Sequence, residues 1–359
     1  MTTFHHHINR RPTRHIKVGN VLIGGEAPIS VQSMTNTPTT DVEATLAQIQ
    51  RLARAGCDLM RVSVPDTESV TAFAKLKPLC PVPLIADIHF DYKLAIAVAP
   101  YADKLRINPG NIGGKEKIRE IIHACQNHHI PIRIGVNGGS LPKDLYRQYG
   151  LIPQALVEAA LRHIELFDEL GFHDIVLSIK TSEVLLMVEA CRQLSAQVDY
   201  PQHLGVTEAG PGIRGAARSA LGIGLLLAEG IGDTIRVSLT GDKLQEVVVA
   251  YEILDTLGLR RRGIRWISCP TCARTSVDVE KVVLEAMEKV GDISTPLTVA
   301  VMGCGVNGPG EAREADVGIA CGVGSGLLFR RGEILRKVSE VQLVDKLVDE
   351  ILRLADISQ

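Results

Sequence analysis

The chain has 359 residues, which is too long for one ordinary domain and predicts two. Its formal net charge of -2 and its aromatic content of 4% argue against a nucleic-acid-binding surface. No apolar run approaches the roughly 20 residues of a membrane span, and the polar, His-rich start lacks the apolar core of a secretory signal. We therefore expect a cytoplasmic protein whose cysteines are reduced, with no membrane partner.

A repeated unit runs through residues 20–260: a short β-rich run, a turn rich in Gly, Asn and Asp, and a segment with helical spacing. Helices are expected at 41–55, 154–170 and 243–257, among others. Eight strands that alternate with helices predict a parallel sheet closed into a (β/α)8 TIM barrel, hence an α/β fold. The expected strands are 29–35, 59–64, 83–89, 104–108, 131–137, 174–180, 203–208 and 234–239.

An open dinucleotide-binding sheet is the competing fold, because Gly210–Gly215 fits the pattern G-x-G-x-x-G. However, this match follows the seventh strand rather than the first, and no convincing acidic ribose ligand lies at the usual distance. In a barrel, the same loop would lie where phosphate sites often form.

Polar side chains recur at the carboxyl ends of the expected strands. Side chains at i and i+2 share one face of a strand, and such pairs are Arg61/Ser63, Asp87/His89, Arg106/Asn108, Ser178/Lys180 and Arg236/Ser238. Arg133 and Asn137 share a face, and Glu208 ends the seventh strand. Cations on five strands, all at the end where catalytic groups of this fold gather, predict a pocket for a phosphate-rich anion. A set of internal salt bridges is the alternative.

The sequence after the barrel contains three cysteines and a glutamate with the spacing of a metal site, in addition to Cys321. They stand in Cys269-Pro270-Thr271-Cys272, at Cys304 and in Gly308-Pro309-Gly310-Glu311. This spacing suits an iron–sulfur cluster with Glu311 as an oxygen donor, but a zinc site completed by Cys321 and a redox dithiol remain open. We expect the remaining cysteines to be buried core thiols; these are Cys57, Cys80, Cys125 and Cys191.

The boundary between the two expected domains lies near Arg260-Arg261-Arg262-Gly263, a plausible exposed linker. We expect a substrate-binding barrel at 1–260 and a small α/β cluster-binding domain at 261–359. Residues 325–338 are expected to form a hairpin around Arg331-Gly332. Two rival functions stay open at this point: a pterin-type barrel group transferase with a structural zinc tail, and a non-enzymatic scaffold.

The chain resembles the 4-hydroxy-3-methylbut-2-en-1-yl diphosphate synthase family of the non-mevalonate isoprenoid pathway nearly end to end. The resemblance rests on motifs that occur in order: Val31–Thr35, Ala86–Phe90, Arg106–Asn111, Gly135–Ser140, Thr207–Gly210, Gly230–Thr234, Cys269–Cys272 and Asn307–Glu311. The short interval between Leu257 and Cys269 has no room for the extra domain of plant-type members, so the chain looks like the two-domain bacterial form.

The resemblance implies the reductive, two-electron ring opening of 2-C-methyl-D-erythritol 2,4-cyclodiphosphate with loss of water. It also implies a [4Fe-4S] cluster and flavodoxin or ferredoxin as the electron donor. By matching position, the cluster ligands are Cys269, Cys272, Cys304 and Glu311, and Glu208 is an acid near the reacting carbons. The diphosphate would be held by Arg61, Arg106, Arg133, Lys180, Arg236 and Ser238, with further substrate contacts from Asp87 and Asn137.

The linker also predicts a homodimer. The last helix of a βα unit returns to the amino-terminal face of a barrel, so residue 260 leaves opposite the mouth. At about 3.5 Å per residue, a short linker does not carry Cys269 around the barrel. We therefore expect each cluster domain to cap the barrel of a partner chain, as the resemblance also implies.

Overall fold

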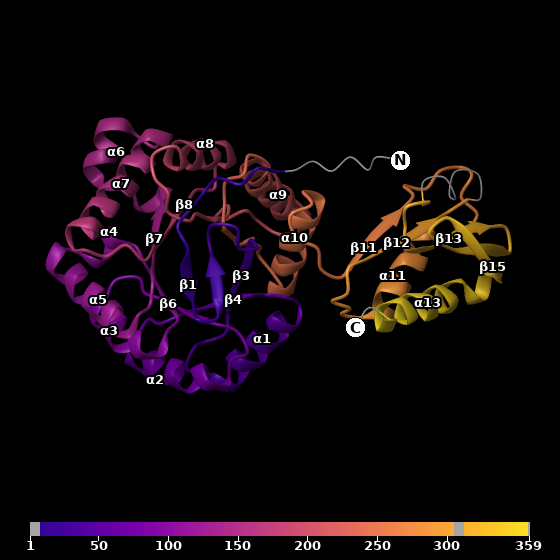
Figure 1. Cartoon of the computed structure of the whole chain (residues 1–359), viewed down its shortest axis with the longest axis horizontal. Coiled ribbons are helices and arrows are strands. Elements are labelled where there is room, and N and C mark those ends of the chain that lie inside the picture. Colours follow the sequence, from indigo (N-terminus) through magenta and orange to yellow (C-terminus); the bar gives the residue numbers. More distant parts are fainter. Residues whose placement is uncertain (1–7, 305–311, 358–359) are drawn as a thin grey trace. The chain divides into compact units, whose positions relative to one another are not determined.

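The computed structural model describes residues 8–304 and 312–357. The chain divides into two compact units that meet between Arg260 and Arg261 (Figure 1).

The first unit contains an eight-stranded parallel sheet. The two strands that end the strand order of this sheet, β8 and β9, are also neighbours. The order is β8-β7-β6-β5-β4-β3-β10-β9, and a parallel bridge between Leu177 and Gln202 joins β8 to the chain just before β9. The sheet thus closes into a barrel, and the open dinucleotide-binding sheet is excluded. The strands are β3 (Ser30–Met34), β4 (Leu59–Ser63), β5 (Leu84–Asp87), β6 (Lys104–Ile107), β7 (Ile132–Asn137), β8 (Ile175–Lys180), β9 (His203–Leu204) and β10 (Thr234–Ile235).

All eight expected strands occur, but the last two are much shorter than expected. β9 ends before Gly205, where an added Cβ would lie 2.4 Å from the carbonyl oxygen of Arg236. The two backbones therefore approach more closely here than side-chain-bearing strands allow. One further bond, from the Arg236 N–H to the Leu204 carbonyl at 2.9 Å, continues the pairing beyond β10.

Helices surround the barrel, as the sequence predicted (Figure 1). Aspartates cap several of them: Asp41 accepts from the Ala44 N–H, Asp66 from Ser69 and Asp242 from Leu244. The helices are α1 (Val42–Arg54), α2 (Thr67–Leu76), α3 (Tyr92–Val98), α4 (Pro109–Ile112), α5 (Lys115–His128), α6 (Lys143–Tyr149), α7 (Pro153–Glu169), α8 (Val184–Ser195), α9 (Gly212–Ala228) and α10 (Lys243–Thr256). In α10, Val247, Tyr251 and Leu254 are buried, but Val248 is exposed.

A short hairpin that the sequence did not predict covers one end of the barrel interior. It consists of β1 (Ile16–Val18) and β2 (Val21–Ile23). Its Ile16, Val18 and Ile23 form an apolar cluster with inward residues of the barrel strands, Leu59, Ile85 and Val176. These strand residues precede the polar strand ends, so this apolar cluster closes one end of the interior and the cationic side chains line the other end.

The second unit is built on a five-stranded mixed sheet of order β11-β12-β13-β14-β15. Its elements are β11 (Ile264–Ser268), α11 (Val279–Val290), β12 (Leu297–Met302), β13 (Val317–Gly322), β14 (Ser325–Arg330), β15 (Glu333–Ser339) and α13 (Leu343–Ile357). The expected hairpin around Arg331-Gly332 is confirmed, and both turn residues have positive φ, 47° and 80°. Among the described residues, no helix combines the length and apolarity needed to cross a membrane.

Candidate active site

The carboxyl ends of the barrel strands surround a cavity of about 640 Å³. All nine side chains that the sequence predicted as catalytic or substrate-binding line this cavity, so the structure brings them together. They are Arg61, Asp87, Arg106, Arg133, Asn137, Lys180, Glu208, Arg236 and Ser238. That these residues hold a substrate remains a prediction at this point.

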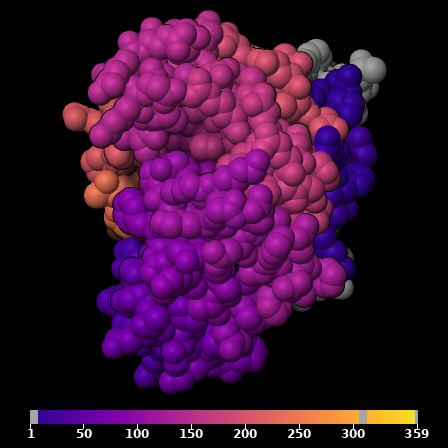
Figure 2. Space-filling model, turned by 90° about the vertical axis from the view of Figure 1, so that its left-hand side faces the viewer, coloured from indigo at the N-terminus to yellow at the C-terminus, as the bar shows by residue number. Residues whose placement is uncertain are grey.

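Strand register explains why these side chains meet. In neighbouring strands Asp87 pairs with Arg106, Arg106 with Arg133, and Asn137 with Lys180. Residues in register on parallel strands present their side chains to the same face, here the barrel interior. Five Arg or Lys side chains from five strands or strand ends therefore converge on one hollow. The space-filling view shows one face of the barrel unit, with a hollow between its purple and magenta segments (Figure 2).

Asp87 is the carboxylate that organises one side of this cationic ring. It is buried and lies 3.3 Å from Arg106, 3.3 Å from His89 and 3.8 Å from Arg61. Burial by itself raises the pKa of Asp87, but the charges of Arg61 and Arg106 and the hydrogen bond from His89 outweigh it. The pKa is held well below the usual range, so Asp87 is an anion that orients two arginines.

Arg133 and Lys180 have no such carboxylate partner among the described residues. Arg133 is 1% exposed, and one of its terminal nitrogens donates to the Ser178 hydroxyl at 3.1 Å. Its Nε and its other terminal nitrogen have no hydrogen-bond partner within the described part of the chain. Burial, then the neighbouring cations, lowers the pKa of both Arg133 and Lys180. An excess of positive charge that is buried away from water costs free energy until an anion neutralises it.

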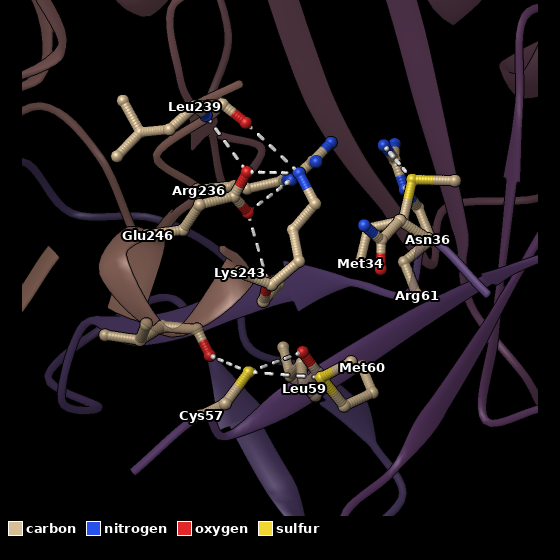
Figure 3. Close-up of polar contacts among 12 residues, drawn as sticks. Met34, Asn36, Cys57, Leu59, Met60, Arg61, Arg236, Leu239, Lys243 and Glu246 are labelled. Carbon is tan, nitrogen blue, oxygen red and sulfur yellow. Dashed lines mark hydrogen bonds and ion pairs between the residues drawn. The ribbon is translucent and has the colours of Figure 1, made fainter. Parts of the chain in front are cut away.

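Arg61 makes its closest contacts with a sulfur atom. Its Nε and one terminal nitrogen lie 3.2 and 2.9 Å from the Met34 Sδ (Figure 3). A thioether is only a weak acceptor. A phosphate oxygen would compete easily for these donors.

Two glycines make room for the cations. A Cβ at Gly135 would lie 3.0 Å from the Arg106 Nε, and one at Gly205 would lie 2.8 Å from the Lys180 Nζ. The long side chains of neighbouring strands thus occupy space that any other residue type would fill at these two positions.

Glu208 stands at the mouth with a strained backbone. Its φ is 54°, a left-handed conformation that is uncommon for a residue with a side chain. Within the described residues, the carboxylate that pairs with Arg236 is not Glu208 but Glu246, which lies 3.7 Å from the Arg236 Nε. Glu208 is exposed at the cavity and is therefore available to a ligand.

Some lining residues were not predicted as site residues. The loop after β7 contributes Gly138, Gly139 and Ser140, and Asn111, Thr181 and Glu183 line other parts of the wall. Asn108, paired with Arg106 in the sequence pattern, instead donates to the Ser140 hydroxyl at 2.8 Å and caps α4. The Gly210–Gly215 segment begins α9 and is not among the lining residues.

The cysteines of the second unit line a separate hollow of about 240 Å³. Cys269 and Cys272 follow β11, and Cys304 follows β12, which pairs in parallel with β11 from Ile264↔Leu297 to Ser268↔Val301. The backbone N–H of Gly303 donates to the Cys269 Sγ at 3.1 Å. Parallel pairing therefore brings Cys304, at the carboxyl end of β12, close to Cys269 and Cys272 at the carboxyl end of β11.

Glycine is also required beside these thiols. A Cβ at Gly303 would lie 2.8 Å from side chains of Thr275 and Val279 and 3.2 Å from the Cys269 Sγ. The pKa of Cys272 is lowered, first by a hydrogen bond from the Arg274 backbone and then by the Arg274 charge. Three thiols, one accepting a backbone N–H, around a hollow of this size fit a bulky inorganic group.

Glu311, the expected oxygen donor, lies outside the described residues. Among those described, no group of three or more Cys, His, Asp and Glu side chains is close enough to enclose a metal ion. Cys321, the alternative fourth zinc ligand, is buried in the core of the second unit with Val301 and Leu328 and does not line the hollow. Of the barrel cysteines, Cys57, Cys125 and Cys191 are buried, but Cys80 is only half-buried. All eight cysteines are described, as free thiols.

Comparison with known proteins covers both units of the chain. Residues 13–251 match the GcpE TIM-barrel domain, and residues 265–353 match the GcpE protein C-terminal domain. The chain is 53% identical over 343 residues to 4-hydroxy-3-methylbut-2-en-1-yl diphosphate synthase (flavodoxin) of Clostridium perfringens, covering 95% of this chain and 98% of the relative. The protein of the same name from Thermodesulfovibrio yellowstonii is 54% identical over 346 residues, covering 96% and 99%.

Among solved structures, a Yersinia pestis dihydropteroate synthase in complex with a sulfonamide drug has a TM-score of 0.51. It is 14% identical and covers 69% of this chain and all of that one. This likeness shows the barrel fold alone and does not favour a pterin-type transferase. Near full-length identity above 50% and the two family matches place the chain in the GcpE family of 4-hydroxy-3-methylbut-2-en-1-yl diphosphate synthases, which are oxidoreductases.

Proposed function

We propose that the barrel cavity binds 2-C-methyl-D-erythritol 2,4-cyclodiphosphate and that the chain reduces it to 4-hydroxy-3-methylbut-2-en-1-yl diphosphate. The observation that carries the proposal is the convergence of five Arg or Lys side chains on one cavity that contains a single fully buried carboxylate, Asp87, among its described lining residues. A cyclic diphosphate supplies the negative charge that this ring lacks, and guanidinium groups match its oxygens in bidentate geometry.

The side chains divide into anchored and free cations. Arg61 and Arg106 are oriented by Asp87, whereas Arg133 and Lys180 have no carboxylate partner in the described chain. The free cations would supply most of the attraction, and the anchored ones would fix the orientation of the diphosphate. Asn137, Arg236 and Ser238 would complete the contacts on the remaining sides of the cavity.

For the cofactor, we propose a [4Fe-4S] cluster held by Cys269, Cys272, Cys304 and Glu311. Support comes from the three thiols around one hollow and from the Gly303 N–H that donates to Cys269. The cluster would supply two electrons one at a time and a Lewis-acidic iron. We propose that these electrons come from flavodoxin, which stands in the names of the relatives, or from ferredoxin.

We propose Glu208 as the acid that gives a proton to the departing oxygen as water leaves. Its carboxyl lines the cavity, and no described residue forms an ion pair with it. Its left-handed backbone, at φ 54°, is a strain of the kind that collects at functional sites. A Glu208→Gln variant that retains full turnover would contradict this role.

The point at which the chain leaves the barrel supports a homodimer in which each cluster domain caps the partner's barrel. Arg260 donates to the Ile29 carbonyl and to the Asp58 carboxylate, at 3.1 and 2.6 Å. Ile29 and Asp58 directly precede β3 and β4, so Arg260 is held at the end of the barrel opposite the cavity. The nine residues to Cys269 span at most about 31 Å. A mixed dimer of Cys304→Ala and Arg236→Ala chains should regain activity; failure to do so would contradict capping in trans.

Turnover of the cyclodiphosphate by anaerobically purified protein with reduced flavodoxin tests the proposal. Wild-type protein should release 4-hydroxy-3-methylbut-2-en-1-yl diphosphate, and Arg133→Met should lose most of this activity while keeping its visible spectrum. Equal turnover by both proteins would exclude the cavity as the substrate site.

A further inference from the structure

Glu246 is a fully buried carboxylate that lies outside the cavity yet contacts its wall. It belongs to α10, one of the helices around the barrel, and is 1% exposed. Figure 3 shows its carboxylate directed at Arg236, at Lys243 and at the backbone of Leu239. An ionised carboxylate buried to this degree is costly unless several donors surround it.

Four groups surround the Glu246 carboxylate. Oε1 accepts from the Leu239 N–H at 3.0 Å and from the Lys243 Nζ at 2.8 Å. Oε2 accepts from the Ser33 hydroxyl at 3.1 Å and lies 3.7 Å from the Arg236 Nε. One side chain thereby joins β3, α10 and the chain that follows β10.

These contacts bear on two expected substrate ligands at once. Arg236 contacts the carboxylate directly, and Leu239, whose N–H is bound, is the neighbour of Ser238. Within the described residues, Glu246 is the carboxylate in ion-pair contact with Arg236, whereas Asp87 serves Arg61 and Arg106. Each of the two buried carboxylates therefore orients a different side of the cationic ring.

We propose that Glu246 is the positioning residue for Arg236 and Ser238: it holds the Nε side of Arg236 at the wall and leaves the terminal guanidinium nitrogens directed into the cavity. This inference rests on the proposed binding of the cyclodiphosphate. Without the carboxylate, Arg236 would lose its attraction to the wall, and the bound N–H beside Ser238 would lose its acceptor.

Glu246→Gln is an informative substitution because glutamine has nearly the same size as glutamate but carries no charge. The amide has one oxygen to accept with, while its NH2 group would face donors from Ser33 or from Leu239 and Lys243. Asp233→Asn is the matched control. Asp233 is also buried and directly precedes β10 at the opposite end of the barrel, and its carboxylate accepts from Arg10, Thr13 and the Gln202 N–H.

The test is the dissociation constant of the cyclodiphosphate, measured by calorimetry on the oxidised, anaerobic holoprotein. Glu246→Gln should weaken binding about tenfold in the wild-type background and less than about twofold in an Arg236→Met background. Asp233→Asn should lower the melting temperature and leave the dissociation constant unchanged. Equal losses in the two backgrounds, or no loss in either, would overturn the positioning role.

A second variant covers the case in which Glu246→Gln does not fold. Ser33→Ala removes one donor from Oε2 and should weaken binding about threefold, again only when Arg236 is present. An unchanged constant would overturn the proposal. If the wild-type protein itself binds no cyclodiphosphate in this titration, the proposed function is wrong. The titration of the wild-type protein therefore tests the proposed function independently of the positioning role.

Discussion

Gly135 on β7 leaves the space that the Arg106 guanidinium of β6 occupies: a Cβ added to Gly135 would lie 3.0 Å from the Arg106 Nε and 3.1 Å from a terminal nitrogen. The glycine is therefore part of the anion site although it has no side chain. Arg106 is positioned by the space beside Gly135, which has no side chain, and by the Asp87 carboxylate, which lies 3.3 Å from a terminal nitrogen of Arg106.

Gly135→Ala should consequently impair binding more than folding. The new methyl group would push Arg106 away from Asp87, and we expect KM for the cyclodiphosphate to rise about tenfold. Steady-state kinetics of the anaerobic protein measure this. Gly224→Ala on α9, where a Cβ meets no atom within 4 Å, is the control and should leave KM unchanged. An unaltered KM in Gly135→Ala would contradict the placement of Arg106.

Arg133→Met should stabilise the free protein while it weakens ligand binding. Arg133 is buried with two unpartnered nitrogens beside other cations, so the ligand-free barrel carries an uncompensated charge. An apolar side chain of similar length removes that cost, and we expect the free energy of unfolding to rise by about 1 kcal/mol or more. Binding of the cyclodiphosphate should weaken about 100-fold. Chemical denaturation and calorimetry measure the two effects; lower stability with intact binding would show a structural role instead.

The side chains that line the cavity could be predicted because the sequence pattern that identifies them lies within each single strand. Arg106 and Lys180 lie near the carboxyl ends of β6 and β8, whereas Arg133 is the second residue of β7. An alternation of period two shows which side chains share the interior face. Glu246 was not predictable in the same way, since a single glutamate in an amphipathic helix is ordinarily solvated. Only the packing of α10 against β3 and against the chain that follows β10 reveals its partners.

Two other features escaped prediction for physical reasons. The three-residue strands of the β1–β2 hairpin are too short to show a period, and their role comes from contact with Leu59, Ile85 and Val176, far along the chain. The early end of β9 depends on the close approach of Gly205 to the backbone of Arg236, a long-range contact that spacing does not encode.

Acid should destabilise the protein partly through His163 on α7. Burial, and then the Arg162 charge, lowers the pKa of His163 to about 4 in the folded state, against an ordinary value of 6.5. The unfolded chain therefore binds a proton that the folded chain does not as pH falls from 6.5 towards 4. This group should cost up to about 1.4 kcal/mol of stability per pH unit in that window and nothing above it.

Denaturation midpoints at pH 7 and pH 5 for wild type and His163→Gln measure this contribution. The variant should lose less stability between the two pH values. An identical loss in both proteins would mean that His163 is protonated in the folded state.

Cys304→Ala should impair the cysteine-lined site of the second unit and leave the cationic cavity of the first unit intact. The thiol lines the hollow of the second unit, whereas the described residues that line the cationic cavity belong to the first. We expect loss of visible absorption and of turnover, with the affinity for inorganic diphosphate retained within about twofold. Calorimetry with diphosphate measures the second effect. A large loss of affinity would show that anion binding depends on the metal site.

The most direct measurement of the central claim is the iron, zinc and acid-labile sulfide content of protein purified without oxygen. A cluster held by Cys269, Cys272, Cys304 and Glu311 predicts about four irons and about four sulfides per chain and no stoichiometric zinc. One zinc per chain with no sulfide would contradict the account, because the chain would then have no means of delivering electrons to the cyclodiphosphate.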